Sequence, residues 1–182
     1  MRFVMFVVAA LILGVSGMAS AAEDTAPATE KKVRVGVFDS RAIAVAYAQS
    51  KSGQERFQQE FRQLKKELDK AEASGDKEKA ESIKAAGKAG QERLHLQGFG
   101  TASVREYLDL MKDKIPPVAK ETGVDLIVSK WEVTYQGSGV EIVDITDELV
   151  NVFEPNERVL KIVQELRKTQ PVNDAEIRKI KD

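Results

Sequence analysis

The stretch SRAIAVAYAQSKSGQERFQQEFRQLKKELDKA, residues 40–71, decides what fold to expect of the whole chain. Its apolar and small residues recur at alternating intervals of four and three, which is the a/d spacing of a heptad repeat. The spacing resumes after Ser74-Gly75-Asp76 and continues to Ile115. It therefore predicts an antiparallel helical (coiled-coil) hairpin over residues 40–115. The larger residues of its seam are Phe57, Phe61, Leu64, Leu68, Ile83, Leu94, Val104 and Leu108.

Glycines punctuate the predicted hairpin. Gly53 is expected to weaken the first helix by about 1 kcal/mol relative to alanine. With the turn at Ser74-Gly75-Asp76, antiparallel pairing places Gly87 opposite Leu64 and Gly90 opposite Phe61, so that large side chains meet small ones. Gly98 and Gly100 predict a flexible or bent point in the returning helix. That helix is expected to end or kink at Pro116-Pro117, because proline removes an amide donor.

Short apolar segments flank the hairpin and predict a small β body. A strand is expected at 33–38, a buried strand at 124–128, a third strand at 131–135, a short extended piece at 140–143, and a helix capped by Asp144 or Thr146. Helices are also predicted at 156–168 and from Asn173 or Asp174 to Ile180. The fold class is therefore α+β, with a body formed by 33–39 and 124–153 and a helical extension over 154–182. Candidate residues of the body core or an oligomer interface are Val35, Val37, Leu126, Val128 and Ile145.

The first 32 residues read as a leader and a linker. Met1-Arg2, an apolar run from Phe3 to Val15 and the small residues at 19–21 predict a signal peptide over 1–21. An uncleaved anchor is the alternative, but the apolar run is shorter than the ~20 residues of a spanning helix. Residues 22–32 are expected to be a disordered linker. The chain has no cysteine, so its small core must be stabilised by packing or by oligomerisation.

In its order of elements the chain resembles the Skp/OmpH family of periplasmic chaperones. Three segments carry the resemblance: VGVFDS at 35–40, AKETGVDLIV at 119–128 and VDITDELV at 143–150. Together with the intervening hairpin they cover about 33–153, the expected OmpH-like domain.

The resemblance implies a periplasmic homotrimer in which strands of the subunits form a β body and the hairpins surround a cavity. Unfolded outer-membrane proteins would be held there without ATP, and their aggregation would be prevented. The chain differs from the best-known member in a shorter hairpin, in the extension after Pro155 and in its charge. Lysine and arginine total 28 against 29 acidic residues, so contact with a membrane surface does not follow from the resemblance.

The sequence contains no arrangement typical of an enzyme. His95 is the only histidine, and an isolated histidine on a helix is expected to be solvated or partly packed rather than catalytic. No cofactor, metal or nucleic-acid partner is expected. Among the aromatic residues, Phe99 is the candidate client contact, because the others nearby fall on the seam. The alternative function is that of a coiled-coil structural or adaptor protein of the cell envelope that binds one folded partner.

Overall fold

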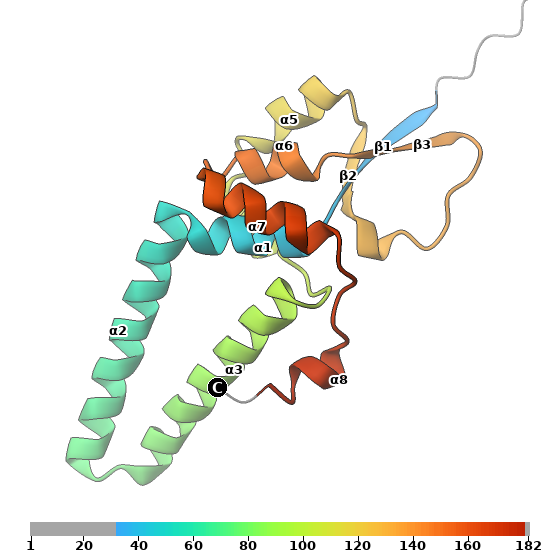
Figure 1. Ribbon diagram of the computed structural model, residues 1–182. Coiled ribbons are helices and arrows are strands. Elements are labelled where there is room, and N and C mark those ends of the chain that lie inside the picture. Colours follow the sequence, from blue (N-terminus) through green and yellow to red (C-terminus); the bar gives the residue numbers. More distant parts are fainter. Residues whose placement is uncertain (1–31, 181–182) are drawn as a thin grey trace, which may run out of the picture. The chain divides into compact units, whose positions relative to one another are not determined.

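Three parallel strands form a small sheet in the computed structural model, which describes residues 32–180 (Figure 1). The central strand β1, Val33–Phe38, pairs on one side with β2, Leu126–Ser129, and on the other with β3, Val140–Asp144. The register sets Val35 beside both Leu126 and Ile142. The α+β prediction is confirmed. The predicted leader and all but the last residue of the predicted linker lie outside the described residues.

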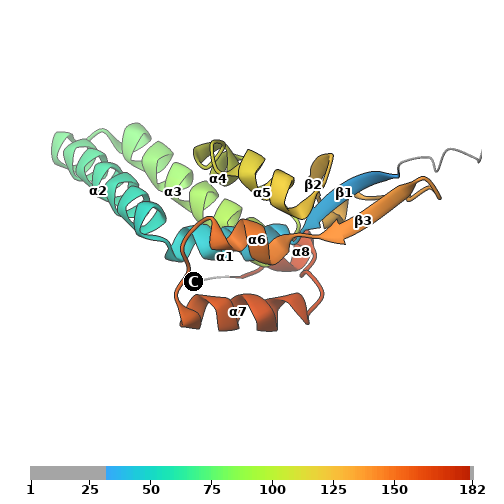
Figure 2. The ribbon, with the colours of Figure 1, turned by 90° about the horizontal axis from the view of Figure 1, so that it is seen from above.

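Helices account for most of the described chain. They are α1 Ser40–Gln49, α2 Lys51–Ser74, α3 Lys77–Gly98, α4 Arg105–Leu110, α5 Ile115–Thr122, the 3₁₀ turn η1 Lys130–Glu132, α6 Thr146–Asn151, α7 Glu157–Arg167 and α8 Asp174–Ile177. In both ribbon views α7 runs alongside α1 (Figures 1 and 2). None of the described helices is long and apolar enough to cross a membrane.

The two faces of the sheet differ in what covers them. Gly36 faces the helical core, where a Cβ on it would lie 2.7 Å from Cδ1 of Ile145. Because side chains alternate along a strand and paired residues share a face, the opposite face is apolar except for Asp144, which pairs with Val37 at the end of β3. Its apolar residues are Val33, Val35, Val37, Leu126, Val128, Val140 and Ile142. Val33 and Leu126 are about half exposed there, so this face is only partly covered.

The first predicted helix is broken at Ser50. This residue is extended, with φ −71° and ψ 156°, and its Oγ accepts a hydrogen bond from the amide of Gly53 at 3.1 Å. The same hydroxyl donates to the carbonyl of Tyr47 at 2.7 Å. Ser50 is thus the C-cap of α1 and the N-cap of α2, so the two helices are not continuous. As a result α1 belongs to the body, with Ile43 and Tyr47 buried, and only α2 continues into the hairpin (Figure 1).

The returning helix is also shorter than the heptad spacing predicts. It ends at Gly98, residues 99–104 are not helical, and α4 and α5 follow as separate short helices. Pro116 and Pro117 lie in the first turn of α5 and so begin a helix instead of ending one, because first-turn amides have no partner to lose. The hairpin thus consists of α2 and α3 alone.

The predicted strand at 131–135 is wrong. Lys130–Glu132 form a 3₁₀ turn, and the amide of Trp131 donates to Oγ of Ser129 at 3.4 Å. The extended piece at 140–143 is β3, and the predicted C-terminal helices are α6, α7 and α8. The last strand therefore lies after the 133–139 loop and pairs with β1.

Gly53 has a role that the helix-propensity argument does not anticipate. A Cβ at this position would lie 2.0 Å from the carbonyl oxygen of Tyr47, so alanine cannot be accommodated without a backbone shift. We expect Gly53→Ala to lower the free energy of unfolding by about 1–3 kcal/mol. Gly90→Ala is the matched control, because nothing lies within 4 Å of its Cβ position, and it should raise that free energy by about 0.5–1 kcal/mol. Urea unfolding of both variants measures these changes in the free energy of unfolding. A stabilised Gly53→Ala variant would contradict the helix break at Ser50.

Candidate functional site

An apolar groove of about 690 Å³ lies between α2 and α3. Large side chains line it from α2, and two glycines stand among the residues that line it from α3. From α2 come Phe57, Phe61, Leu64 and Leu68, and from α3 come Ile83, Gly87, Gly90 and Leu94; Glu60, Lys65, Lys84, Gln91 and Arg93 form its edges. Phe61 is 69% exposed and Leu94 is 37% exposed. A helix-lined groove with exposed aromatic and aliphatic side chains is suited to binding apolar groups.

The groove is closed at the tip of the hairpin. Gly75, at φ 73°, makes the turn, and Asp76 caps α3 by accepting from the amide of Lys79. Next to the turn, the buried residues Ala71 of α2 and Ala80 and Ile83 of α3 form a small separate core, and Leu64 and Leu68 pack against it. The two helices are therefore in close contact only at this end.

Toward the body the contact between the helices is lost. A Cβ on Gly87 would lie 3.9 Å from Cδ2 of Leu64, in agreement with the pairing predicted for these two residues. A Cβ on Gly90 would have no neighbour within 4 Å, so Phe61 has no packing partner there. The glycines that were expected to bring the helices together instead leave space beside Phe61.

A polar network joins the open end of the groove to the body. Glu106 of α4 lies 3.7 Å from Arg56 of α2 and 3.5 Å from Arg93 of α3. Gln97 donates to Glu106 at 3.0 Å and accepts from the hydroxyl of Tyr107 at 2.5 Å. Burial, followed by the charge of Glu106, raises the pKa of Tyr107 to about 12, so this phenol stays a donor across the physiological pH range.

The charged side chains at the edges of the groove have partners of opposite charge, and for Lys65 and Lys84 these partners lie within the hairpin. Lys65 lies 3.6 Å from Asp69, and Lys84 lies 3.2 Å from Glu72. Exposed pairs of this kind stabilise a fold by little. They also leave no strong field of one sign around the groove, so apolar contact must dominate the binding of any ligand.

The predicted seam residues fall into two groups. Six of them line the groove: Phe57, Phe61, Leu64, Leu68, Ile83 and Leu94. Val104 and Leu108 lie beyond the end of α3 and pack into the core of the body. Phe99, the candidate client contact, caps the C-terminus of α3 and is 47% exposed, but it is not among the residues that line the groove.

The five candidate body residues also separate. Val35, Val37, Leu126 and Val128 share the partly covered face of the sheet. Ile145 lies on the other side, fully buried against Gly36. Val35, Leu126 and Val128 are at least partly exposed on this face, whereas Val37, at 7% exposure, and Ile145 are buried core residues.

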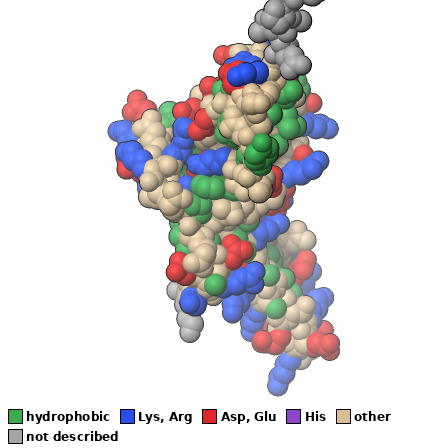
Figure 3. All heavy atoms as spheres, turned by 90° about the vertical axis from the view of Figure 1, so that its right-hand side faces the viewer, with side chains coloured by type: hydrophobic (Ala, Val, Ile, Leu, Met, Phe, Trp, Pro, Cys, Tyr) green, Lys and Arg blue, Asp and Glu red, His purple; other side chains and the backbone are tan. Residues whose placement is uncertain are grey.

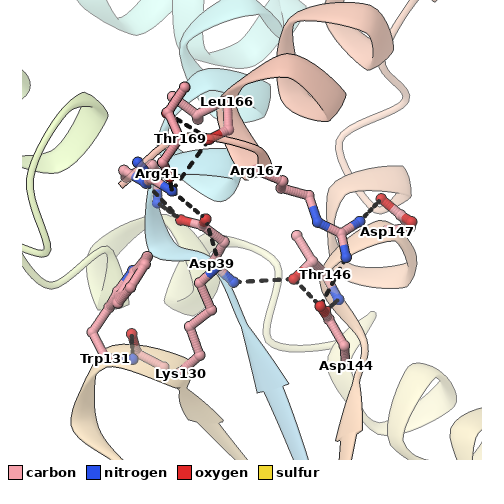
Figure 4. Close-up of polar contacts among 11 residues, drawn as sticks. Asp39, Arg41, Lys130, Trp131, Asp144, Thr146, Asp147, Leu166, Arg167 and Thr169 are labelled. Carbon is pink, nitrogen blue, oxygen red and sulfur yellow. Dashed lines mark hydrogen bonds and ion pairs between the residues drawn. The ribbon is translucent and has the colours of Figure 1, made fainter. Parts of the chain in front are cut away.

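A buried ion cluster at the carboxyl ends of the strands is invisible in the sequence (Figure 4). Asp39 is fully buried, and its carboxylate lies 2.8 Å from both Arg41 and Lys130. Its backbone amide donates to Oγ1 of Thr146 at 3.0 Å. Arg41 and Lys130 also lie over the ring of Trp131, at 5.1 Å and 4.4 Å from its centroid. The carboxylate is saturated by its cations, so the cluster fastens η1 and α1 together.

The described residues hold no constellation typical of catalysis. His95 lies 5.8 Å from the ring of Phe99, between centroids, and no group of three or more His, Asp or Glu side chains within 32–180 could hold a metal ion. The groove is therefore the site with the clearest binding chemistry. A comparison of the chain with protein-family models, curated proteins and solved structures finds no match.

Proposed function

We propose that the chain is an ATP-independent holdase chaperone that binds apolar segments of unfolded outer-membrane proteins in the groove between α2 and α3. The observation that carries this proposal is the pair of exposed residues, Phe61 and Leu94, in an apolar groove that the hairpin itself does not fill. A self-sufficient coiled coil would bury both residues in its seam. Export to the periplasm, as the leader and the family resemblance imply, is part of the proposal.

The partly covered face of the sheet supports assembly of several copies, which is part of the proposed function. This face is apolar on all three strands except for Asp144 at the end of β3, and Figure 3 shows hydrophobic side chains exposed among polar ones in the upper part of the molecule. Contact between copies through this face, in the trimer that the resemblance implies, would bury Val33 and Leu126. Several hairpins in one assembly would raise the effective concentration of weak sites around one client.

The groove residues provide the test. A fully buried phenylalanine or leucine contributes about 1.5–3 kcal/mol, so the variant Phe61→Ser/Leu94→Ser should bind an unfolded barrel protein at least about tenfold more weakly. Its own free energy of unfolding should fall by no more than about 1–2 kcal/mol, because Phe61 is mostly exposed and Leu94 is only partly buried. Light scattering of a diluted, denatured barrel protein measures the suppression of aggregation, and the mass of the free chain by the same method gives its oligomeric state.

The matched control replaces the same residue types outside the groove. Phe99 and Leu110 are 47% and 55% exposed, and Phe99→Ser/Leu110→Ser should suppress aggregation as well as the unaltered chain does. Equal loss in both double variants would place client contact outside the groove. A monomer without effect on the client would overturn the proposal, and tight binding of one folded envelope protein would favour the adaptor function.

A further inference from the structure

The C-terminal strap, residues 168–180, connects the body to the base of the hairpin. At its start, Nη2 of Arg41 donates to the carbonyls of Leu166, at the end of α7, and of Thr169, at 3.3 Å and 3.0 Å. Further on, the amide of Val172 donates to the carbonyl of Phe99 at 2.9 Å. Arg178 lies 3.1 Å from Glu92 of α3. Figure 1 shows α8 beside α3, so the strap has one end on α1 and the other on the hairpin.

One buried side chain anchors the strap. Ile177 is 1% exposed, whereas Ile180, three residues later, is 45% exposed. A Cβ on Gly100 would lie 2.9 Å from Cδ1 of Ile177, so this close approach requires glycine. Asn173 caps α8 by accepting from the amide of Glu176 at 3.0 Å. A helix of four residues is not stable by itself, so α8 depends on the insertion of Ile177.

The strap is attached where the hairpin is jointed to the body. Residues 99–104 between α3 and α4 are not helical, and α2 meets the body at the helix break at Ser50. Neither leg of the hairpin therefore enters the body as a continuous helix, which is the arrangement in which a helix can change direction. The non-helical segment 99–104 is the joint between α3 and the body. The side chain of Gln97 donates to the carbonyl of Ser103 across this joint at 2.9 Å, and Ile177 contacts the joint at Gly100.

We propose that the C-terminal strap is a releasable latch that sets the direction of the hairpin relative to the body. Its attachment to the hairpin rests on a single buried isoleucine, one backbone hydrogen bond and one partly exposed ion pair, so this end of the strap belongs to the part of the structure that opens locally. Its release frees the joint at 99–104, lets α3 swing about Gln97 and changes the opening of the groove. The latch concerns the geometry of the hairpin and does not depend on what the groove binds.

Distance measurements between spin labels test the latch in the full chain. The chain has no cysteine, so cysteines at Lys77, at the tip, and Glu148, an exposed residue of α6, label two chosen sites. Ile177→Asp should shift the distance distribution and broaden it about twofold, and amides of α8 should exchange at least about tenfold faster. Ile180→Asp, the matched control, should leave both measurements unchanged.

Two outcomes would overturn the latch. The first is an unchanged distance distribution in Ile177→Asp while α8 exchanges rapidly, because the strap would then be released without effect on the hairpin. The second is full protection of α8 in this variant, because Ile177 would then not be its anchor. Circular dichroism checks that the variant is folded, and if it is not, Ile177→Ala takes its place with the same expected directions.

Discussion

Asparagine in place of Asp39 is expected to lower the free energy of unfolding by about 3–5 kcal/mol, the usual cost of breaking a buried ion pair by removing one partner. Asp39 and Arg41 are both buried, and Lys130 approaches the same carboxylate. A neutral amide of nearly the same size keeps the packing and the helix cap but leaves two cations without their anion. Urea unfolding at neutral pH measures the difference.

The pH dependence of stability distinguishes lost charge from lost packing. Burial by itself raises the pKa of Asp39, but hydrogen bonds from Arg41 and Lys130 and their positive charges outweigh it, and the pKa lies below the ordinary 3.8. A lowered pKa in the folded state contributes stability that is present above the ordinary pKa and is lost as the pH falls through the folded value. Asp39→Asn should therefore be destabilised most at neutral pH, and its difference from the unaltered chain should shrink as the pH falls below about 4 and through the folded pKa of Asp39.

A second aspartate limits how far the acid dependence can disappear. Burial raises the pKa of Asp144, but hydrogen bonds from Thr146 and the charge of Arg167 lower it further than burial raises it. Part of the acid dependence should thus remain in Asp39→Asn. Asp109→Asn is the surface control, since Asp109 and Arg105 are both exposed and 3.8 Å apart, and it should change stability by no more than about 0.5 kcal/mol. Equal effects of the two substitutions would contradict a structural role for the buried cluster.

Local sequence patterns predict where most helices and strands of this chain lie, but they do not predict where a helix is interrupted. The strand at 33–38, the turn at Gly75 and the C-terminal helices follow from alternation, glycine and capping residues, which act over a few positions. The sequence holds one sign of the helix break at Ser50, because the consecutive seam positions Ser50 and Gln54 are both polar. The spacing alone could not reveal it, since a seam between two helices and the buried side of a body helix have the same period.

The candidate site was predictable in its residues but not in its shape. Six of the eight predicted seam residues line the groove, because one face of each hairpin helix is apolar whatever it contacts. Whether Phe61 is packed or exposed depends on the separation of α2 and α3, which the body sets through contacts such as Arg56 with Glu106. The ion cluster could not be predicted from the sequence either, because Asp39 and Lys130 are brought together only by the pairing of β1 with β2.

Two aromatic residues in the same phase of the heptad pattern give the sharpest test of this structure. Tyr47 and Phe61 are two heptads apart, and a continuous coiled coil would make them equivalent. In the structure Tyr47 is buried in the body, stacked on Tyr107 with 4.2 Å between ring centroids and edge-on to Phe57 and Phe153. Tyr47→Ala should therefore lower the free energy of unfolding by about 3–5 kcal/mol.

Phe61→Ala is the control for Tyr47→Ala, and the two changes in the free energy of unfolding are compared. Because Phe61 is 69% exposed, its loss should change the free energy of unfolding by no more than about 0.5 kcal/mol. Comparable destabilisation by both substitutions in urea would mean that the seam is continuous and that α2 and α3 close over Phe61. A large difference would mean that one periodic pattern serves two purposes: before Ser50 it holds the body together, and after Ser50 it leaves an apolar surface free for binding.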